Sequence, residues 1–191
     1  MNGKKRLLTA GVVAVLVVCA VPALAWAAVW KDKGTNVTKA IEFAAVGGEL
    51  WEVIKKEGEV EKKGGMSCEV RLTFATSGGT TGEVTKFENI KCPTAFGTFA
   101  GCELSSATGK SLPWIVHVNA TDLTITNLKI KRTFKAGCPT SELEKTISEA
   151  TVTLESTTAI DTMNVEGSAT EYTAHSTLKV EGANNGTYGI G

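Results

Sequence analysis

Residues 68–74 read Cys-Glu-Val-Arg-Leu-Thr-Phe, and the alternation in this stretch decides the fold class. Apolar side chains occupy every second position, and charged or hydroxyl side chains occupy the positions between them. A period of two puts the two sets on opposite faces of a β-strand, one buried and one in contact with water. Residues 77–80, Ser-Gly-Gly-Thr, are typical of a turn. The stretch therefore predicts a half-buried strand, with Cys68 on its core face, that runs into a tight turn.

The same alternation recurs on the C-terminal side of this strand. Residues 83–92 and 99–105 predict two more strands, and residues 112–119 predict a clearer one with Trp114 and Val116 on one face. The alternation continues at Leu123 and Ile125 and, in the opposite parity, at Leu128 and Ile130. Three more candidate strands are predicted at Val152 and Leu154, Met163 and Val165, and Leu178 and Val180.

Several short strands joined by Gly-rich turns favour two packed or closed sheets, and abundant threonine suits half-solvated sheet faces. We therefore expect an all-β fold, an antiparallel β-sandwich or barrel-like domain with at most one short helix, preceded by a signal-peptide helix. Between Ile125 and Leu128 the apolar positions change parity, which predicts a bulge or turn at Thr126-Asn127.

Four segments depart from the strand pattern. Ser141 followed by Glu144 forms a capping box, and together with apolar residues at i and i+4 it predicts a short helix through Ile147. Residues 49–56 fit either a strand or a helix. Residues 30–39 and 182–191 are expected to be a loose N-terminal segment and a loose tail.

The first 27 residues are organised like a secretory signal. Residues 4–6, Lys-Lys-Arg, form a basic head, and an apolar run extends from residue 7 to residue 24. Two overlapping small-x-small motifs predict cleavage after Ala25 or Ala27. Two alternatives are a membrane anchor, because the run is about as long as a short spanning helix, and lipidation at Cys19.

The expected mature protein is a single disulfide-bonded β-rich domain, residues 28–191. The chain has 20 basic and 20 acidic residues, and the three basic residues of the head leave with the signal, so 17 against 20 gives a net charge of −3. Only Arg71 and Arg132 remain as arginines, and there is no basic stripe. Nucleic-acid binding depends on neutralising phosphates, so this composition argues against it. We expect membrane contact only through the signal segment before cleavage.

Four cysteines remain after cleavage: Cys68, Cys92, Cys102 and Cys138. An even number in an exported chain predicts disulfides, and four cysteines allow three pairings. We favour Cys92–Cys102 with Cys68–Cys138, because the first pair closes a short loop that contains proline and glycine. No C-x-x-C pair occurs and neither histidine is near a cysteine, so we expect no metal site.

No group of residues forms a catalytic or cofactor-binding signature, so no catalytic residue and no cofactor is predicted. A histidine triad would use His117 or His175 with a serine and a carboxylate. Ser111, Asp122 and Asp161 are available, yet no serine lies in a G-x-S-x-G motif. Phosphate-binding glycine loops are also missing from the sequence. Each histidine is therefore interpreted as an ordinary side chain on the wetter face of a strand.

Leu112-Pro113-Trp114 is the most distinctive string in the sequence. Its simplest interpretation is a strand entry with an aromatic core anchor, and the functional alternative is an exposed Trp platform for a sugar or a partner. A cysteine ahead of a strand, then Leu-Pro-Trp with an alternating continuation, then Cys138, resembles uncharacterised secreted proteins of high-GC Gram-positive bacteria. The resemblance covers residues 68–138, implies a secreted, bacterial, β-rich protein, and implies no activity.

We therefore expect an exported extracellular or cell-envelope protein that acts as a non-enzymatic binding or structural module, with an unknown extracellular ligand or envelope component as its partner. Sheet faces and loops would do the binding. The alternatives are a secreted hydrolase with an unrecognised site and a membrane-active β protein, the latter because residues 151–174 are polar, alternating and poor in Lys and Arg.

Overall fold

The computed structural model describes residues 28–182 and 185–191, so the expected signal segment lies outside the described residues. The described part is all-β and contains no α-helix, which confirms the predicted fold class. Its strands are β1 (Trp30–Asp32), β2 (Thr35–Asn36), β3 (Ile41–Glu57), β4 (Val60–Thr76), β5 (Thr81–Gly97), β6 (Leu104–Lys110), β7 (Trp114–Val118), β8 (Asp122–Phe134), β9 (Glu142–Leu154), β10 (Thr162–Ala169), β11 (Tyr172–Val180) and β12 (Tyr188–Ile190).

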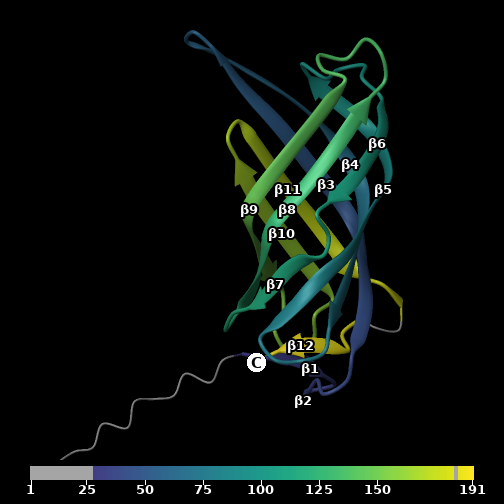
Figure 1. The fold of residues 1–191 in the computed structure, drawn as a ribbon, viewed down its shortest axis with the longest axis vertical. Helices are drawn as coiled ribbons and strands as arrows, with labels where there is room; N and C mark the ends of the chain where they lie inside the picture. Colours follow the sequence, from purple (N-terminus) through teal and green to yellow (C-terminus); the bar gives the residue numbers. More distant parts are fainter. Residues whose placement is uncertain (1–27, 183–184) are drawn as a thin grey trace, which may run out of the picture.

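The large sheet closes on itself and makes the domain barrel-like (Figure 1). Pairing runs in the order β4-β3-β11-β10-β9-β8-β6-β5, and β5 then pairs with β4 again. Strand β7 also pairs with β5 and β8, so β6 and β7 share one position in the wall, one above the other. All pairings are antiparallel. Closure leaves β3 and β8 on opposite walls, with three strand positions between them on either side.

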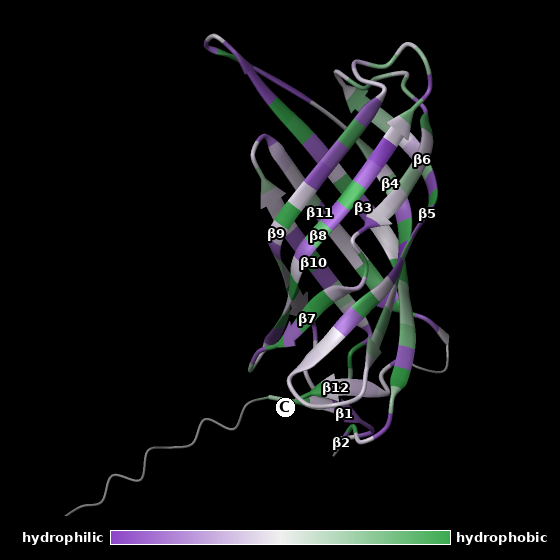
Figure 2. Ribbon diagram, viewed as in Figure 1, coloured by the Kyte–Doolittle hydropathy of each residue, from purple (hydrophilic) through white to green (hydrophobic). Residues whose placement is uncertain are grey.

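The alternation predicted from the sequence sorts side chains between the inside and the outside of this closed sheet. In β4, Cys68, Val70, Leu72 and Phe74 are buried, and the residues between them are partly exposed. Figure 2 shows the same alternation of hydrophobic and hydrophilic residues along the long strands. Trp114 is also buried, and its Nε1 donates to the Lys110 carbonyl at 2.8 Å. The core-anchor interpretation of Leu112-Pro113-Trp114 is therefore right, and the exposed-platform alternative is wrong.

The parity change at Thr126-Asn127 is present, but the predicted bulge or turn is not, because the change occurs in two paired strands at once. Asn127 takes a positive φ of 57°, and the buried positions of β8 shift from Ile125 to Leu128. Strand β9 makes a matching shift between Ile147 and Ala150. Because both strands shift at the same level, Ile125 pairs with Ala150 and Leu128 pairs with Ile147 with no register slip between them.

Three local predictions are wrong or are settled by the structure. The predicted helix from Ser141 to Ile147 is the first half of β9, because Leu143 and Ile147 face the interior of the sheet at strand spacing. Residues 99–105 are mainly a loop rather than a strand, since β6 begins only at Leu104. The ambiguous residues 49–56 lie within the long strand β3.

The glycines beside that ambiguous segment do not end the strand, contrary to their usual effect. A Cβ at Gly47 would lie 1.9 Å from the Thr177 carbonyl oxygen of β11. Only glycine therefore allows β3 and β11 to approach so closely at this point.

The N-terminal segment and the tail are not loose, contrary to expectation. Strands β12, β1 and β2 form a small sheet that covers one end of the closed sheet, at the bottom of Figure 1. Trp30 of β1 is buried, and its ring packs edge-on against Phe43 with centroids 6.0 Å apart. We call this covered end the base, and we call the opposite end, formed by the β3–β4, β5–β6, β8–β9 and β10–β11 connections, the mouth.

The wall of the sheet is incomplete toward the mouth. Strands β5 and β6 pair only at Glu88 and Thr108, and β9 pairs with β10 only from Ala150 to Leu154. A three-stranded flap therefore consists of residues 104–110, 128–134 and 142–149. It is hydrogen-bonded across its own strands and has a break in strand pairing on each side. One side chain bridges the β9–β10 break, where the Lys145 ammonium donates to the Thr170 carbonyl at 3.1 Å.

Candidate functional site

A buried ion pair crosses the interior of the sheet from the flap to the opposite wall. The Arg132 guanidinium on β8 donates to both carboxylate oxygens of Glu49 on β3, at 2.7 and 2.8 Å, and to the Tyr172 hydroxyl on β11 at 2.8 Å. Arg132 is 0% exposed and Glu49 is 4% exposed. Charge-assisted bonds in such a dry setting are the strong kind, provided that the geometry is good.

Aromatic rings surround the guanidinium. Its Cζ lies 4.8 Å from the Trp51 ring centroid and 5.9 Å from that of Tyr172, so both rings offer cation–π contacts. Burial alone would lower the pKa of Arg132, but the Glu49 carboxylate and the Tyr172 hydroxyl raise it above its ordinary value. Burial raises the pKa of Tyr172 to about 12. The arginine is therefore charged, and the tyrosine is neutral, throughout the physiological range.

This ion pair is not among the features predicted above, although the sequence carries a signal for it. Arg132 stands between Ile130 and Phe134 at an inward position of β8, and Glu49 stands between Gly47 and Trp51 at an inward position of β3. A charge at an apolar position of an alternating strand is costly unless it is paired. Arg132 and Glu49 both occupy such inward positions, so each needs a buried partner of opposite charge.

The mouth contains a pocket of about 450 Å³ between the flap and the opposite wall. Its floor includes Val53, Phe99 and Leu143. Phe99 in turn packs edge-on against Trp51, with centroids 5.3 Å apart, so the pocket lies directly above the aromatic surroundings of the ion pair. A pocket of this size, with an apolar floor and a few polar groups around it, is the usual form of a small-molecule site.

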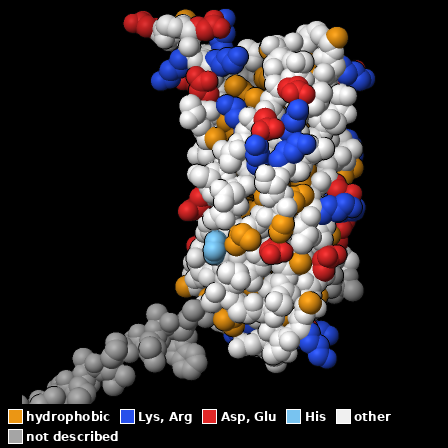
Figure 3. Space-filling model, in the orientation of Figure 1, with side chains coloured by type: hydrophobic (Ala, Val, Ile, Leu, Met, Phe, Trp, Pro, Cys, Tyr) orange, Lys and Arg blue, Asp and Glu red, His pale blue; other side chains and the backbone are white. Residues whose placement is uncertain are grey.

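Charged side chains from both walls form the rim of this mouth pocket. Lys55, Glu57 and Lys62 come from the β3–β4 hairpin, and Glu142 comes from β9. Figure 3 shows basic and acidic side chains gathered where this hairpin projects beyond the rest of the sheet, and in the sequence these are lysines and glutamates. Glu57 pairs with Lys62 at 2.6 Å, and the hydrogen bond from Lys62 lowers the pKa of the Glu57 carboxyl.

Both disulfides expected from the cysteine count are present, but the favoured pairing is wrong. The bonds are Cys68–Cys92 and Cys102–Cys138. The first joins the adjacent strands β4 and β5 at a shift in their register. The second joins the β5–β6 loop to the β8–β9 loop, directly beside the floor residue Phe99, whose carbonyl accepts the Cys102 amide at 2.8 Å. Proximity in the sheet, and not the shortest loop in the sequence, sets the pairing.

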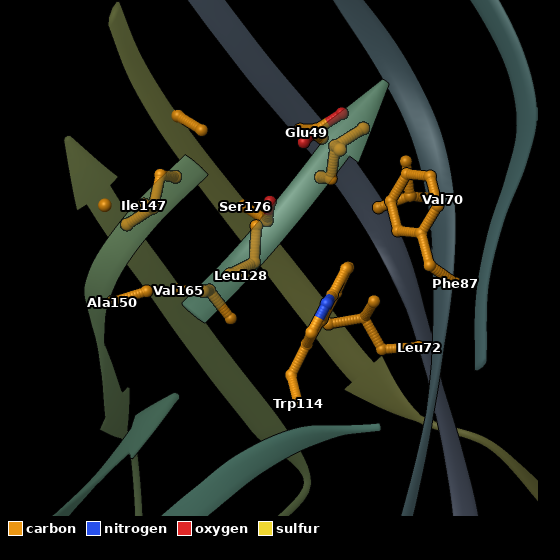
Figure 4. A pocket seen from close by; sticks show the side chains of 13 residues that line it. Glu49, Val70, Leu72, Phe87, Trp114, Leu128, Ile147, Ala150, Val165 and Ser176 are labelled. Atoms are coloured by element: carbon orange, nitrogen blue, oxygen red, sulfur yellow. The ribbon is translucent and has the colours of Figure 1, made fainter. Parts of the chain in front are cut away.

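A small cavity lies deeper in the sheet, on the base side of the ion pair. It measures about 20 Å³, room for about one water molecule. Figure 4 shows Leu72, Phe87 and Trp114 on one side of it and Ile147, Ala150 and Val165 on the other, with Glu49 and Ser176 as its polar residues. The cavity is too small for an organic ligand.

The histidines and their possible partners are not assembled into a triad. His117 points outward on β7 opposite Thr81 and Thr124, and within the described residues no hydrogen bond or ion pair joins it to Ser111, Asp122 or Asp161. His175 points outward on β11, and its Nδ1 lies 3.3 Å from Glu166.

The serine that lines the same hollow as the His175–Glu166 pair does not complete a triad. Ser168 lines the same open hollow of the outer face. It stands opposite Thr173, diagonal to His175, and no hydrogen bond joins it to the imidazole in the part of the chain that is described.

Comparison with family models, with curated proteins and with solved structures finds no match to this chain. In the described residues, no three His, Cys, Asp or Glu side chains are grouped so that they could hold a metal ion. Over the same residues, no helix is long and apolar enough to cross a bilayer. The mouth pocket and the ion pair beneath it are therefore the features on which a functional proposal can rest.

Removing one partner of the ion pair should cost far more stability than removing both. Arg132→Met leaves a buried carboxylate unpaired, and the free energy of unfolding should fall by about 3–5 kcal/mol. The Arg132→Met/Glu49→Met double variant should recover most of that loss, because an apolar pair of similar volume needs no counter-charge. Urea unfolding of both single variants and the double variant measures the coupling. Equal losses in all three would contradict the pairing.

The Tyr172 hydroxyl should resist ionisation and so make stability fall at high pH. The unfolded phenol ionises near its ordinary pKa of 10 and the folded one near 12, so the contribution of this group is complete below pH 10 and is lost as the pH rises through 12. Its size is about 2–3 kcal/mol. The chain has two tyrosines, Tyr172 and Tyr188. The tyrosinate absorbance that the native protein shows and Tyr172→Phe lacks therefore reports the ionisation of Tyr172. The difference in stability between the native protein and Tyr172→Phe should shrink over this pH range, and a constant difference would refute the assignment.

Proposed function

We propose that this protein is an exported, extracytoplasmic, non-enzymatic binding module that holds a small ligand in the mouth pocket. The observation that carries the proposal is the pocket of about 450 Å³ with an apolar floor and a charged rim. Pockets of roughly 300–1,000 Å³ with mainly apolar linings and a few polar groups are the common small-molecule sites.

The closed sheet supports this reading. Eight strand positions give an interior that side chains just fill or that holds one small ligand. Here the side chains fill the base and the middle, which leaves the space at the mouth. The two breaks in strand pairing allow the flap to adjust to a ligand without breaking hydrogen bonds between strands.

The disulfides support the extracytoplasmic part of the proposal. Such bonds persist in oxidising compartments and are rare in the cytosol. The Cys102–Cys138 bond joins two loops that line the mouth pocket, so it limits the freedom of the site before any ligand arrives. A secreted or cell-envelope location agrees with the basic head, apolar run and cleavage motifs of residues 1–27.

Truncating the pocket floor should weaken ligand binding selectively. The protein is recovered from the medium, where its intact mass should correspond to a start at Trp26 or Ala28, and is screened by thermal shift against small amphipathic molecules. Leu143→Ala should weaken binding of a hit about tenfold by removing apolar contact. Leu50→Ala is the matched control, because Leu50 is 42% exposed on the outer face of β3. Calorimetric affinities that the two variants change equally, or a screen without a hit, would refute the pocket as the site.

A further inference from the structure

The rim of the mouth pocket has no net charge, but one of its lysines lacks a close counter-charge. Four charged side chains line the pocket: Lys55, Glu57, Lys62 and Glu142. Both carboxylates are already neutralised, Glu57 by Lys62 at 2.6 Å and Glu142 by Lys131 at 2.9 Å. Within the described residues Lys55 has neither an ion pair nor a side-chain hydrogen bond. Its ammonium attracts the Glu57 carboxylate only at longer range, so it is the charge on this rim best placed to meet a ligand.

The position of Lys55 in the hairpin strengthens this point. Lys55 and Lys62 stand directly opposite each other in the β3–β4 pairing. Like charges that face each other across two strands repel and destabilise the pair. Glu57 bonds to Lys62 and attracts Lys55 at longer range, so it relieves part of this repulsion. A negative group placed between the two ammonium groups would be attracted to both of them.

The apolar floor of the mouth pocket indicates that part of the ligand is apolar. Val53 and Phe99 are buried side chains, and Leu143 is partly buried and packs against the core. Together they offer a surface that lies on the ion-pair side of the charged rim. A ligand that satisfies both parts has an apolar body and one anionic end.

We infer that the mouth pocket binds a free anionic amphiphile, a single-chain molecule whose carboxylate, phosphate or sulfate meets Lys55 and Lys62 and whose apolar chain covers Val53, Phe99 and Leu143. This inference rests on the proposed function and specifies its ligand class. The flap and the opposite wall each supply part of the site, so the bound molecule lies between them.

The test compares three probes of equal chain length, decanoate, decanol and decyltrimethylammonium, each below its micelle concentration. Calorimetry should show decanoate binding more tightly than decanol, and the cation binding weakest. Added salt should weaken decanoate binding and leave decanol unaffected, because screening acts on the exposed rim charges. Decyl phosphate and decyl sulfate identify which anionic head is preferred.

Rim variants should shift decanoate affinity in opposite directions. Lys55→Gln should weaken it about fivefold, in line with an exposed charge contact. Glu57→Gln should strengthen it, because it releases Lys62 from its ion pair. Lys56→Gln is the matched control, since Lys56 is next in the chain and carries the same charge but does not line the pocket. None of these three exposed residues belongs to the core, so all variants should fold.

The outcomes separate this inference from the proposed function. Decanol binding as tightly as decanoate, with Lys55→Gln without effect, would overturn the anionic class and leave the pocket as a binding site. Binding of none of the probes, together with no response of any hit to Leu143→Ala, would overturn both. Binding to anionic vesicles but not to monomeric decanoate would also overturn the inference, since the partner would then be a membrane surface.

Discussion

The contact between Arg132 and Glu49 joins the flap to the opposite wall, in the half of the sheet where the flap has few hydrogen bonds to its neighbouring strands. Toward the mouth, β5 separates from β6 and β9 separates from β10, so the flap has no ladder of hydrogen bonds to the wall beside it. The guanidinium reaches across the interior from β8 to β3 and β11 instead. A buried pair of this kind gives little net stability relative to an apolar pair, but its hydrogen bonds from Nη2 to both Glu49 oxygens and from Nη1 to Tyr172 fix how the two walls face each other. The shape of the mouth pocket depends on that spacing.

The two ends of the molecule have different physical roles. At the base, the small sheet of β1, β2 and β12 and the ring of Trp30 exclude water and complete the core. At the mouth, exposed lysines and glutamates surround an apolar floor, and a disulfide holds two of the lining loops. The base and the middle are therefore packed with core side chains, and the mouth holds the pocket and the flap that lacks strand pairing at its sides. This arrangement suits a protein that binds a ligand from solution.

The sequence predicts the strand content well, because a period of two needs only local information. It shows which face of β4 is buried and where β8 changes parity. Which distant strands become neighbours is set by the whole sheet, so neither the closure nor the disulfide pairing could be predicted from spacing. The capping box at Ser141 was misleading because a local helix signal is weak beside the burial of Leu143 and Ile147.

The inward positions of Arg132 and Glu49 in alternating strands indicate that each side chain needs a buried partner. The sequence does not indicate that the two are partners of each other. The flap and the mouth pocket depend on missing pairings, which no local pattern reveals.

Hydrogen exchange tests the role of the ion pair most directly. In the Arg132→Met/Glu49→Met variant, compared with the native protein at equal global stability, amides in the mouth half of β9, residues 142–147, should exchange faster. Amides in the base half, residues 150–154, which pair with β10, should keep their protection. Protection that is unchanged in both halves, or lost equally from both, would show that the Arg132–Glu49 contact does not hold the flap to the opposite wall.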